Sequence, residues 1–321
     1  MKNKFFKFLF TLILAFITIF SFCLNIKADS LYVYVGGDAI GLDLETGVYV
    51  TGKFDIEKNN LLAKGDIITK VNKKEVECVD ELKNIIDNLD YGKVIDVSFI
   101  RNGLEMNAPV TVCVKDGKKT IGVYAKDNML GVGTLTYVTP NTNTFGSLGH
   151  SACSDLIEVS GGQILNCYIS GVKKGIRGIP GEKKAILENK IIGSVSINND
   201  FGVFGVLNEF DTNDRDLIEV ADVNDVEIGV AVIRTVVDGT KIEEYEIEIT
   251  EIEKQDNLKT KGVKYKVIDE ELIEKTGGII QGMSGSPIIQ NDKLIGAVSH
   301  VIINDPLVGY GVFACWMTQF S

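Results

Sequence analysis

Histidine is scarce in this chain, and its two occurrences, His150 and His300, limit where acid–base chemistry at neutral pH can arise. Ser284 lies 134 residues after His150, within the run GMSGSP at 282–287. A serine hydroxyl is a poor nucleophile until a base removes its proton, so Ser284 requires an imidazole within hydrogen-bond reach. The pattern therefore predicts nucleophilic catalysis with His150 as the base and Ser284 as the nucleophile.

The GMSGSP run resembles the G-D-S-G-G-P nucleophile loop of chymotrypsin-like serine proteases. Glycines let such a loop turn sharply and aim backbone N–H groups at a developing oxyanion. We predict that the N–H groups of Gly282 and Ser284 form the oxyanion hole. His300 follows a predicted strand, Leu294–Ser299, that corresponds in outline to the substrate-pairing strand of those enzymes. This predicts a substrate pocket at Ser299 and His300. The alternative for His300 is a hydrogen-bonded core histidine.

Short strands separated by Gly, Asn and Asp follow one another from Ile121 onward, which is typical of an all-β sandwich or barrel. Within them, the segment 243–253 (EEYEIEITEIE) alternates apolar residues with glutamates and predicts a strand with one solvated acidic face. The cysteines beyond the N-terminal segment are five in number and lack CxxC spacing, so the sequence signals neither a metal site nor a disulfide framework.

The segment from Leu31 to Val114 mixes short β-rich runs with one amphipathic helix, expected at Val79–Asp87. Its run GDIITKVN at 65–72 resembles the PDZ domain, which predicts an α+β unit. The resemblance also implies a loop whose N–H groups receive a peptide end. That loop would consist of Ile40, Gly41, Leu42, Asp43 and Leu44. Two uses stay open, namely binding a C-terminus or docking on a neighbouring part of the same chain.

The first residues carry three lysines followed by an uncharged stretch, Phe8–Leu24, which is the pattern of a secretory signal. Cleavage near Ala28 and retention as a membrane anchor are both open. The remaining body carries 29 basic and 44 acidic residues, a net charge of −15, which excludes nucleic acid as a partner. We predict an export segment at 1–28, a PDZ domain at 29–114 and a peptidase domain at 115–321.

A more specific resemblance rests on the residues around Ser284. The stretches 276–290 (TGGIIQGMSGSPIIQ) and 294–301 (LIGAVSHV), with Asn304-Asp305-Pro306, are similar to the SpoIVB peptidase family. The stretch Gly146–His150 resembles that family's G-x-L-G-H motif. The resemblance covers nearly the whole chain and implies a mostly β protein. Its implied order is an export segment, a PDZ domain and a chymotrypsin-like double β-barrel peptidase domain.

This resemblance implies a catalytic triad of His150, Asp269 and Ser284, because the family has an aspartate fifteen residues before its serine. We therefore expect Asp269→Asn to reduce turnover by orders of magnitude. Two observations leave open which aspartate is the acid of the triad. Asp269 precedes EELIEK and then Gly277, which is also typical of an N-cap, a short helix and a glycine C-terminus. Asp200 follows His150 by 50 residues, where chymotrypsin-like folds usually carry the acid.

The implied function is an exported serine endopeptidase of sporulation signalling that needs no metal or organic cofactor. By the same resemblance it acts between forespore and mother cell and cleaves itself. It would also cleave a regulatory membrane protein that restrains an intramembrane metalloprotease, which processes pro-sigma-K. The alternative is a catalytically inactive protein in which the PDZ domain recruits a partner at the membrane surface.

Overall fold

The computed structural model describes residues 30–54, 61–153, 159, 161–253, 255 and 257–321. The chain divides into two compact units, Met1–Leu31 and Tyr32–Ser321. The predicted export segment lies outside the described residues. Among the helices that the structure does describe, none is both long enough and apolar enough to cross a membrane.

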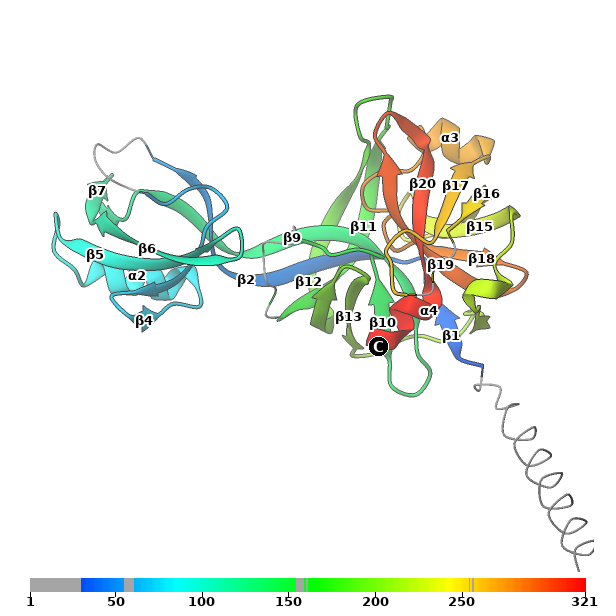
Figure 1. The fold of residues 1–321 in the computed structure, drawn as a ribbon, viewed down its shortest axis with the longest axis horizontal. Coiled ribbons are helices and arrows are strands. Elements are labelled where there is room, and N and C mark those ends of the chain that lie inside the picture. The colour runs from blue at the N-terminus through cyan, green and yellow to red at the C-terminus, as the bar shows by residue number, and fades with distance from the viewer. Residues whose placement is uncertain (1–29, 55–60, 154–158, 160, 254, 256) are drawn as a thin grey trace, which may run out of the picture. The chain divides into compact units, whose positions relative to one another are not determined.

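The second unit consists mainly of antiparallel strands and contains few helices (Figure 1). Its strands are β1 (Tyr32–Val35), β2 (Ala39–Lys53), β3 (Ile67–Val71), β4 (Lys74–Glu75), β5 (Val94–Arg101), β6 (Leu104–Thr111), β7 (Cys113–Lys115), β8 (Lys118–Thr120), β9 (Val123–Val138), β10 (Thr144–Ser147), β11 (Gly161–Lys173), β12 (Glu182–Asn199), β13 (Gly202–Leu207), β14 (Leu217–Val220), β15 (Gly229–Val236), β16 (Ile242–Ile252), β17 (Val263–Val267), β18 (Pro287–Gln290), β19 (Lys293–Ile302) and β20 (Asp305–Phe313). Its helices are α2 (Val79–Asp87), α3 (Glu270–Thr276), α4 (Ala314–Met317), η1 (Val223–Asp225) and η2 (Thr318–Phe320).

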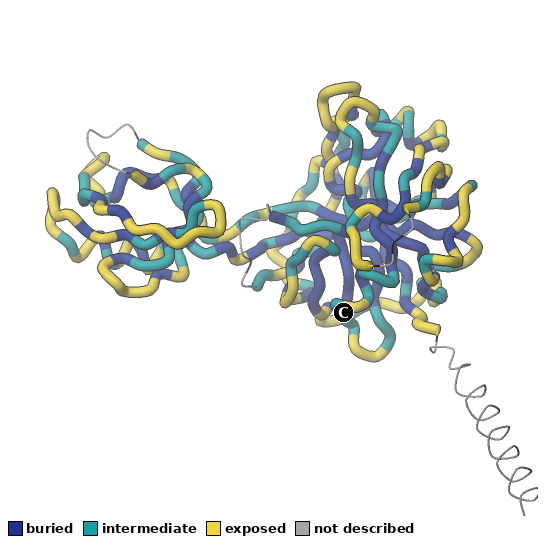
Figure 2. The backbone as a smooth tube through the Cα atoms, viewed as in Figure 1, coloured by how far each residue is buried: buried dark blue, intermediate teal, exposed yellow. Residues whose placement is uncertain are grey.

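Six strands pair side by side in a first closed ring. The order is β9, β10, β13, β12, β11 and β2, and β2 pairs back onto β9. Alternate side chains form a buried core that includes Leu42, Leu135, Phe145 and Ile164. Figure 2 shows the buried stretches of the backbone in dark blue. His150 follows directly after β10, so this ring positions the predicted base.

A second closed ring has the order β15, β16, β17, β20, β19 and β18, and β18 pairs back onto β15. Its core includes Ile233, Ile247, Ile288 and Phe313. The strand expected at 243–253 is confirmed as β16, with Tyr245, Ile247 and Ile249 buried between exposed residues. Ser284 lies just before β18, so this ring positions the predicted nucleophile.

A third core belongs to what we call the α2 lobe, the described residues from 46 to 126. The helix predicted at Val79–Asp87 is confirmed as α2, and it buries Leu82 and Ile86. A charge-assisted pair fixes a neighbouring turn, because Arg101 Nε and Nη2 donate to the two carboxylate oxygens of Asp66, each at 2.7 Å. Asp66 is fully buried.

The boundary of the α2 lobe differs from the predicted division at residue 114. Residues 39–45 of β2 pair with β9 and β11 in the first ring, although the sequence assigned them to the first domain. Conversely, Ile121 and Val123 pack in the core of the α2 lobe. The lobe is therefore inserted between two ring strands, because both β2 and β9 run from the ring into the lobe.

Candidate active site

The nucleophile loop, residues 282–287, connects the segment after α3 to β18. Gly282 and Gly285 adopt φ of 93° and 91°, a region that favours glycine. A Cβ at Gly285 would also collide with the carbonyl oxygen of Thr134. The sequence therefore needs glycine here for both backbone conformation and space.

Strand β9 fixes the back of this loop through two threonines. The Thr134 N–H donates to Ser284 O at 2.8 Å, and Thr134 Oγ1 donates to Gly282 O at 2.8 Å. Thr136 Oγ1 donates to Gly285 O at 2.7 Å. Both threonine side chains are fully buried, so the loop is held by hydrogen bonds that are shielded from water.

His150 lies on a turn that brings it to Ser284. Leu148 and Gly149 have φ of 68° and 66°, and this left-handed pair bends the chain after β10. The His150 Nε2 atom lies 2.8 Å from Ser284 Oγ. Its Nδ1 atom lies 2.6 Å from the carbonyl oxygen of Ser151.

These partners assign the proton on the His150 ring. A carbonyl oxygen only accepts, so Nδ1 carries the hydrogen and donates it to Ser151 O. In the neutral ring Nε2 is then unprotonated and accepts from the Ser284 hydroxyl. This is the tautomer that a general base needs to deprotonate Ser284.

The electrostatic environment keeps the base neutral near pH 7. Burial lowers the pKa of His150 below its ordinary value of 6.5, and the hydrogen bond to Ser151 opposes part of that shift. The ring of His300 lies 5.4 Å from that of His150, centroid to centroid. The pKa of His300 is lowered by burial first, and then by the neighbouring His150 and Lys261.

The predicted oxyanion-hole amides are oriented through the carbonyls of their own peptides. Lys183 N–H donates to Gln281 O, and Ser286 N–H donates to Met283 O, both at 2.9 Å. In a trans peptide the N–H points opposite to the C=O, so the amides of Gly282 and Ser284 face the other way. Within the described part of the chain, neither amide donates a hydrogen bond. Both are therefore available to an oxyanion.

A cleft of about 470 Å³ opens beside these groups. His150, Ser284, Ser299 and His300 all border it, so the structure brings the two predicted pocket residues to the predicted base and nucleophile. Ser299 Oγ donates to Tyr310 O and accepts from His300 Nδ1, both at 3.0 Å. Much of the remaining wall is apolar and comes from Leu42, Leu44, Met129, Leu130, Val132, Leu148, Val301 and Ile303.

Comparison with protein families decides the relationship of this chain to known proteins. The family model described as SpoIVB peptidase S55 matches residues 117–318. The chain belongs to the SpoIVB peptidase S55 family. Membership makes it a serine peptidase, and a peptidase acts on protein substrates.

No curated protein matches the chain. Among solved structures, the PDZ domain of the SdrC-like protein from Listeria monocytogenes matches with 21% sequence identity and a TM-score of 0.23. That match covers 25% of this chain and 87% of the Listeria chain. The assignment of the α2 lobe as a PDZ domain stays a prediction.

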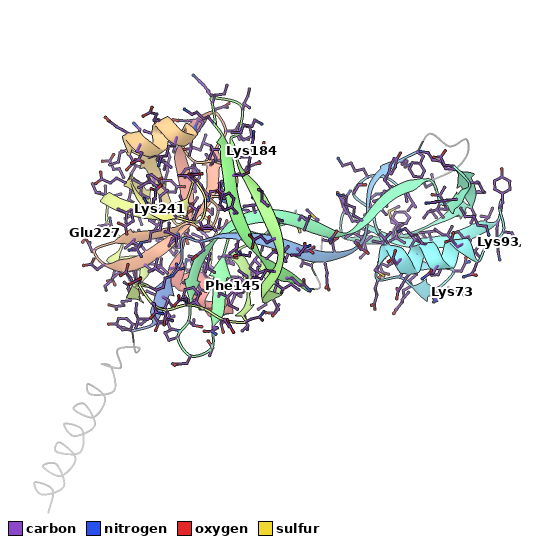
Figure 3. All side chains as sticks on the ribbon, turned by 180° about the vertical axis from the view of Figure 1, so that it is seen from behind. Lys73, Lys93, Phe145, Lys184, Glu227 and Lys241 are labelled. Atoms are coloured by element: carbon purple, nitrogen blue, oxygen red, sulfur yellow. The ribbon has the colours of Figure 1, made fainter. Side chains whose placement is uncertain are left out.

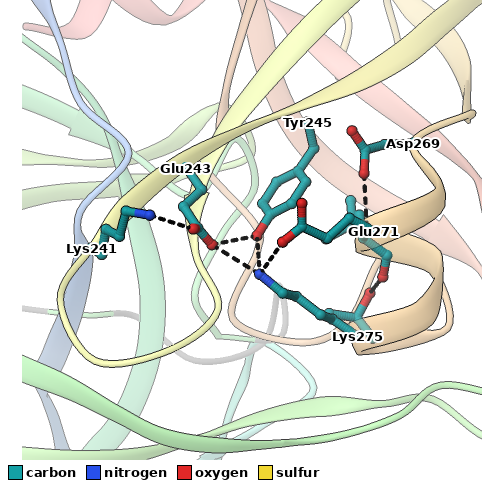
Figure 4. Close-up of polar contacts among 8 residues, drawn as sticks. Lys241, Glu243, Tyr245, Asp269, Glu271 and Lys275 are labelled. Atoms are coloured by element: carbon teal, nitrogen blue, oxygen red, sulfur yellow. Dashed lines mark hydrogen bonds and ion pairs between the residues drawn. The ribbon is translucent and has the colours of Figure 1, made fainter.

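The third residue expected in the SpoIVB-type triad, Asp269, is placed elsewhere. Its Oδ1 accepts from Leu272 N–H at 2.8 Å (Figure 4). Its Oδ2 accepts from Glu246 N–H at 3.3 Å. Asp269 is thus the N-cap of α3, and Gly277 ends the helix in a left-handed conformation. The helical interpretation of this segment is confirmed, and the structure does not bring Asp269 to His150.

Asp200, the other acid considered, shares a small pocket with His150. The pocket measures about 350 Å³ and is also bordered by Ser151, Thr260 and His300. Asn198, two residues earlier, donates to Ser151 Oγ at 2.9 Å and accepts from Ala152 N–H at 2.8 Å. The turn that carries Asp200 is therefore tied to the backbone that follows His150.

The prediction that Ile40–Leu44 form a loop that receives a peptide end is wrong. These residues lie in β2 and pair with β9 on one edge and β11 on the other. Their backbone N–H groups consequently serve the sheet and cannot cradle a carboxylate. Ile40, Leu42 and Leu44 are buried in the core of the first ring.

Several residues of the site carried no signal in the sequence. Ser151 acts through a backbone carbonyl, which every residue possesses. Thr134 and Thr136 act on one face of β9 at the period of two that any strand has. Cys153, which follows His150 closely, is buried against Met129, and burial raises the pKa of its thiol, opposite to what a thiolate nucleophile needs.

Proposed function

We propose that this chain is a serine endopeptidase that cleaves peptide bonds through an acyl-enzyme at Ser284. The observation that carries the proposal is the 2.8 Å contact from His150 Nε2 to Ser284 Oγ, with Nδ1 occupied by Ser151 O. His150 takes the Ser284 proton as Oγ attacks the substrate carbonyl carbon. The amides of Gly282 and Ser284 stabilise the resulting oxyanion. His150 then gives its proton to the leaving amine, and water hydrolyses the ester by the same route.

The group that orients His150 in the resting enzyme is the Ser151 carbonyl. We assign the supporting carboxylate to Asp200, because it borders the same pocket as His150 and lies on the turn tied to Ser151. Asp269 is assigned to capping α3. An acid that stabilises an imidazolium needs to lie beside the ring, and both carboxylate oxygens of Asp269 are engaged at the helix.

The cleft indicates the class of side chain that the enzyme accepts beside the cleaved bond. Its apolar wall consists of Leu42, Met129, Leu130, Val301 and Ile303. Binding of an apolar substrate side chain against this wall is favourable, because it removes apolar surface from water. A charged side chain would lose its hydration there without an opposite charge in return. We therefore propose substrates with an apolar residue at that position.

The biological role that we propose follows the family. It is sporulation signalling between forespore and mother cell, in which the exported protein cleaves itself and then a membrane-bound regulator of an intramembrane metalloprotease that processes pro-sigma-K. Family membership supports this role, as does the uncharged stretch Phe8–Leu24 after three lysines. The α2 lobe, as a PDZ domain, would select the target or the chain's own N-terminal region.

The test follows the body from Asp29 onward over time by intact mass, beside Ser284→Ala and His150→Ala variants. A fluorophosphonate probe is applied to all three proteins in parallel. We expect discrete N-terminal trimming and probe labelling in the parent alone. No trimming and no labelling in the folded parent would overturn the proposal and favour a binding protein led by the α2 lobe.

A further inference from the structure

Lys183 is a buried lysine that the proposed reaction does not use. It lies on β12 of the first ring, and only 6% of its surface is exposed. Its Nζ donates to Thr235 Oγ1 at 2.8 Å and to Thr134 Oγ1 at 3.3 Å. Thr235 belongs to β15 and Thr134 to β9, so the ammonium joins the two rings.

Three contacts run from Lys183 to the nucleophile loop. The first passes through Thr134, whose hydroxyl accepts from Lys183 Nζ and donates its own hydrogen to Gly282 O at 2.8 Å. The second is the backbone bond from Lys183 N–H to Gln281 O. The third is packing, because a Cβ at Gly282 would lie 3.0 Å from Lys183 Cδ. All three converge on Gly282 and the two peptide groups that flank it, one of which carries the Gly282 amide.

The charge of Lys183 has little local compensation. Threonine hydroxyls face the ammonium from β9 and β15, and the Cys167 thiol acts on it electrostatically from β11. Within the described residues, no carboxylate forms an ion pair with it. Burial lowers the pKa of Lys183 to about 7, so both protonation states are accessible near neutral pH.

We propose that Lys183 is a positioning residue of the peptidase, whose ammonium acts through Thr134 to hold Gly282 in the orientation that completes the oxyanion hole. A protonated lysine makes charge-assisted hydrogen bonds, which are about twice as strong as neutral ones. Loss of its proton weakens the hydrogen bond to Thr134 and removes a positive charge that is one hydroxyl away from Gly282 O. The enzyme is then expected to lose activity on the alkaline side, where His150 is already unprotonated. This inference rests on the proposed function.

The two histidines bear on the same pH range. Both have a pKa below 6.5, so their titration governs the acid limb. A fall in activity from about pH 7 upward therefore belongs to another group. Cys153 and Cys167 titrate above their ordinary range because they are buried, which removes the thiols from this window.

The experiment measures covalent labelling of Ser284 in the full chain in detergent, using a fluorophosphonate probe from pH 5 to 9. The maximal rate and the half-saturating probe concentration are determined separately. We compare the parent with Lys183→Met and with Lys184→Met, an exposed neighbour on the same strand (Figure 3). For Lys183→Met we expect a maximal rate about 10- to 100-fold lower, less than the 10²- to 10³-fold cost of losing an oxyanion donor. We also expect half-saturation to change little and the alkaline limb to vanish, while Lys184→Met behaves as the parent.

Two threonine variants keep the test informative if Lys183→Met does not fold. Thr134→Val breaks the link and should lower the maximal rate, whereas Thr134→Ser keeps the hydroxyl and should restore it. Where Lys183→Met folds, its effect and that of Thr134→Val should not add, because both act on one chain of hydrogen bonds. An alkaline limb in Lys183→Met equal to that of the parent, or a Thr134→Val variant as fast as Thr134→Ser, would overturn the inference. Absence of labelling in the parent would instead reject the proposed function itself.

Discussion

Replacing Lys183 by methionine should change how the stability of the protein depends on pH. The unfolded chain holds this lysine at its ordinary pKa of 10.5, whereas burial lowers it to about 7 in the folded state. Between these values the unfolded state binds a proton that the folded state lacks, so the free energy of unfolding rises with pH. The slope from this one group is about 1.4 kcal/mol per pH unit. The sign is opposite to that of a lysine stabilised by a carboxylate.

The two pKa values of Lys183 set the size of the stability change between pH 6 and 8.5. Below about pH 6 both states are protonated, and the full cost of burying the charge, about 5 kcal/mol, lowers stability. At pH 8.5 about 2 kcal/mol of that cost is relieved. Lys183→Met has no such titration. Relative to the parent, its stability advantage should therefore shrink by about 2 kcal/mol between pH 6 and 8.5.

The assay is urea unfolding at several pH values, with Ser284→Ala as the background in both proteins to prevent self-cleavage. The single tryptophan, Trp316, packs against the core of the second ring and reports unfolding by fluorescence. Lys184→Met in the same background should run parallel to the parent. Curves for the parent and Lys183→Met that stay parallel from pH 6 to 8.5 would refute the reasoning, because Lys183 would then keep an ordinary pKa in the folded state.

Four other changes test the rest of the site and fold. Asp269→Ala should lower the free energy of unfolding by about 1 kcal/mol in urea titrations, because α3 loses its N-cap. Asparagine is also a good N-cap, so Asp269→Asn should change stability and fluorophosphonate labelling little. A large loss of labelling in folded Asp269→Asn would return Asp269 to the triad. Asp200→Asn should slow labelling about 10- to 100-fold, less than the 10⁴-fold known for a hydrogen-bonded triad acid, and an unchanged rate would discount it. Gly285→Ala should abolish labelling because its Cβ meets the Thr134 carbonyl, and normal labelling would contradict the loop geometry. Arg101→Met should cost about 3 kcal/mol by leaving the buried Asp66 carboxylate unpaired, which protease sensitivity of the α2 lobe would detect.

The elements that sequence predicts well are those whose signal is local. Helix α2 shows helical spacing of apolar residues, and β16 alternates isoleucines with glutamates, so burial of one face determines each of them. The cap of α3 is equally local, since Asp269 and Gly277 bracket a short helical run. His150 and Ser284 are predictable because their chemistry requires particular residue types.

The segment 40–44 shows where local patterns are ambiguous. A run with apolar residues at 40, 42 and 44, separated by Gly41 and Asp43, is compatible with a loop that offers free N–H groups. It is equally compatible with a strand buried in a ring. The choice depends on whether partners exist on both edges, and β9 and β11 come from residues about 90 and 120 positions further along the chain. The burial of Lys183 is not predictable from the local sequence for a related reason. The run EKKAILENK is typical of a solvated strand, and only closure of the two rings packs the side chain of Lys183 against Gly282.

The identity of the triad acid is a feature that residue spacing in the sequence does not determine. Spacing to Ser284 favours Asp269, but a spacing rule cannot express competition for a carboxylate, and the amides of Leu272 and Glu246 engage both of its oxygens. The resting partner of His150 is moreover a backbone carbonyl, which has no residue signature at all. Orientation of the base is therefore separable from stabilisation of its charged form. The carbonyl of Ser151 suffices for the first, whereas a carboxylate such as Asp200 is needed only when the imidazolium develops.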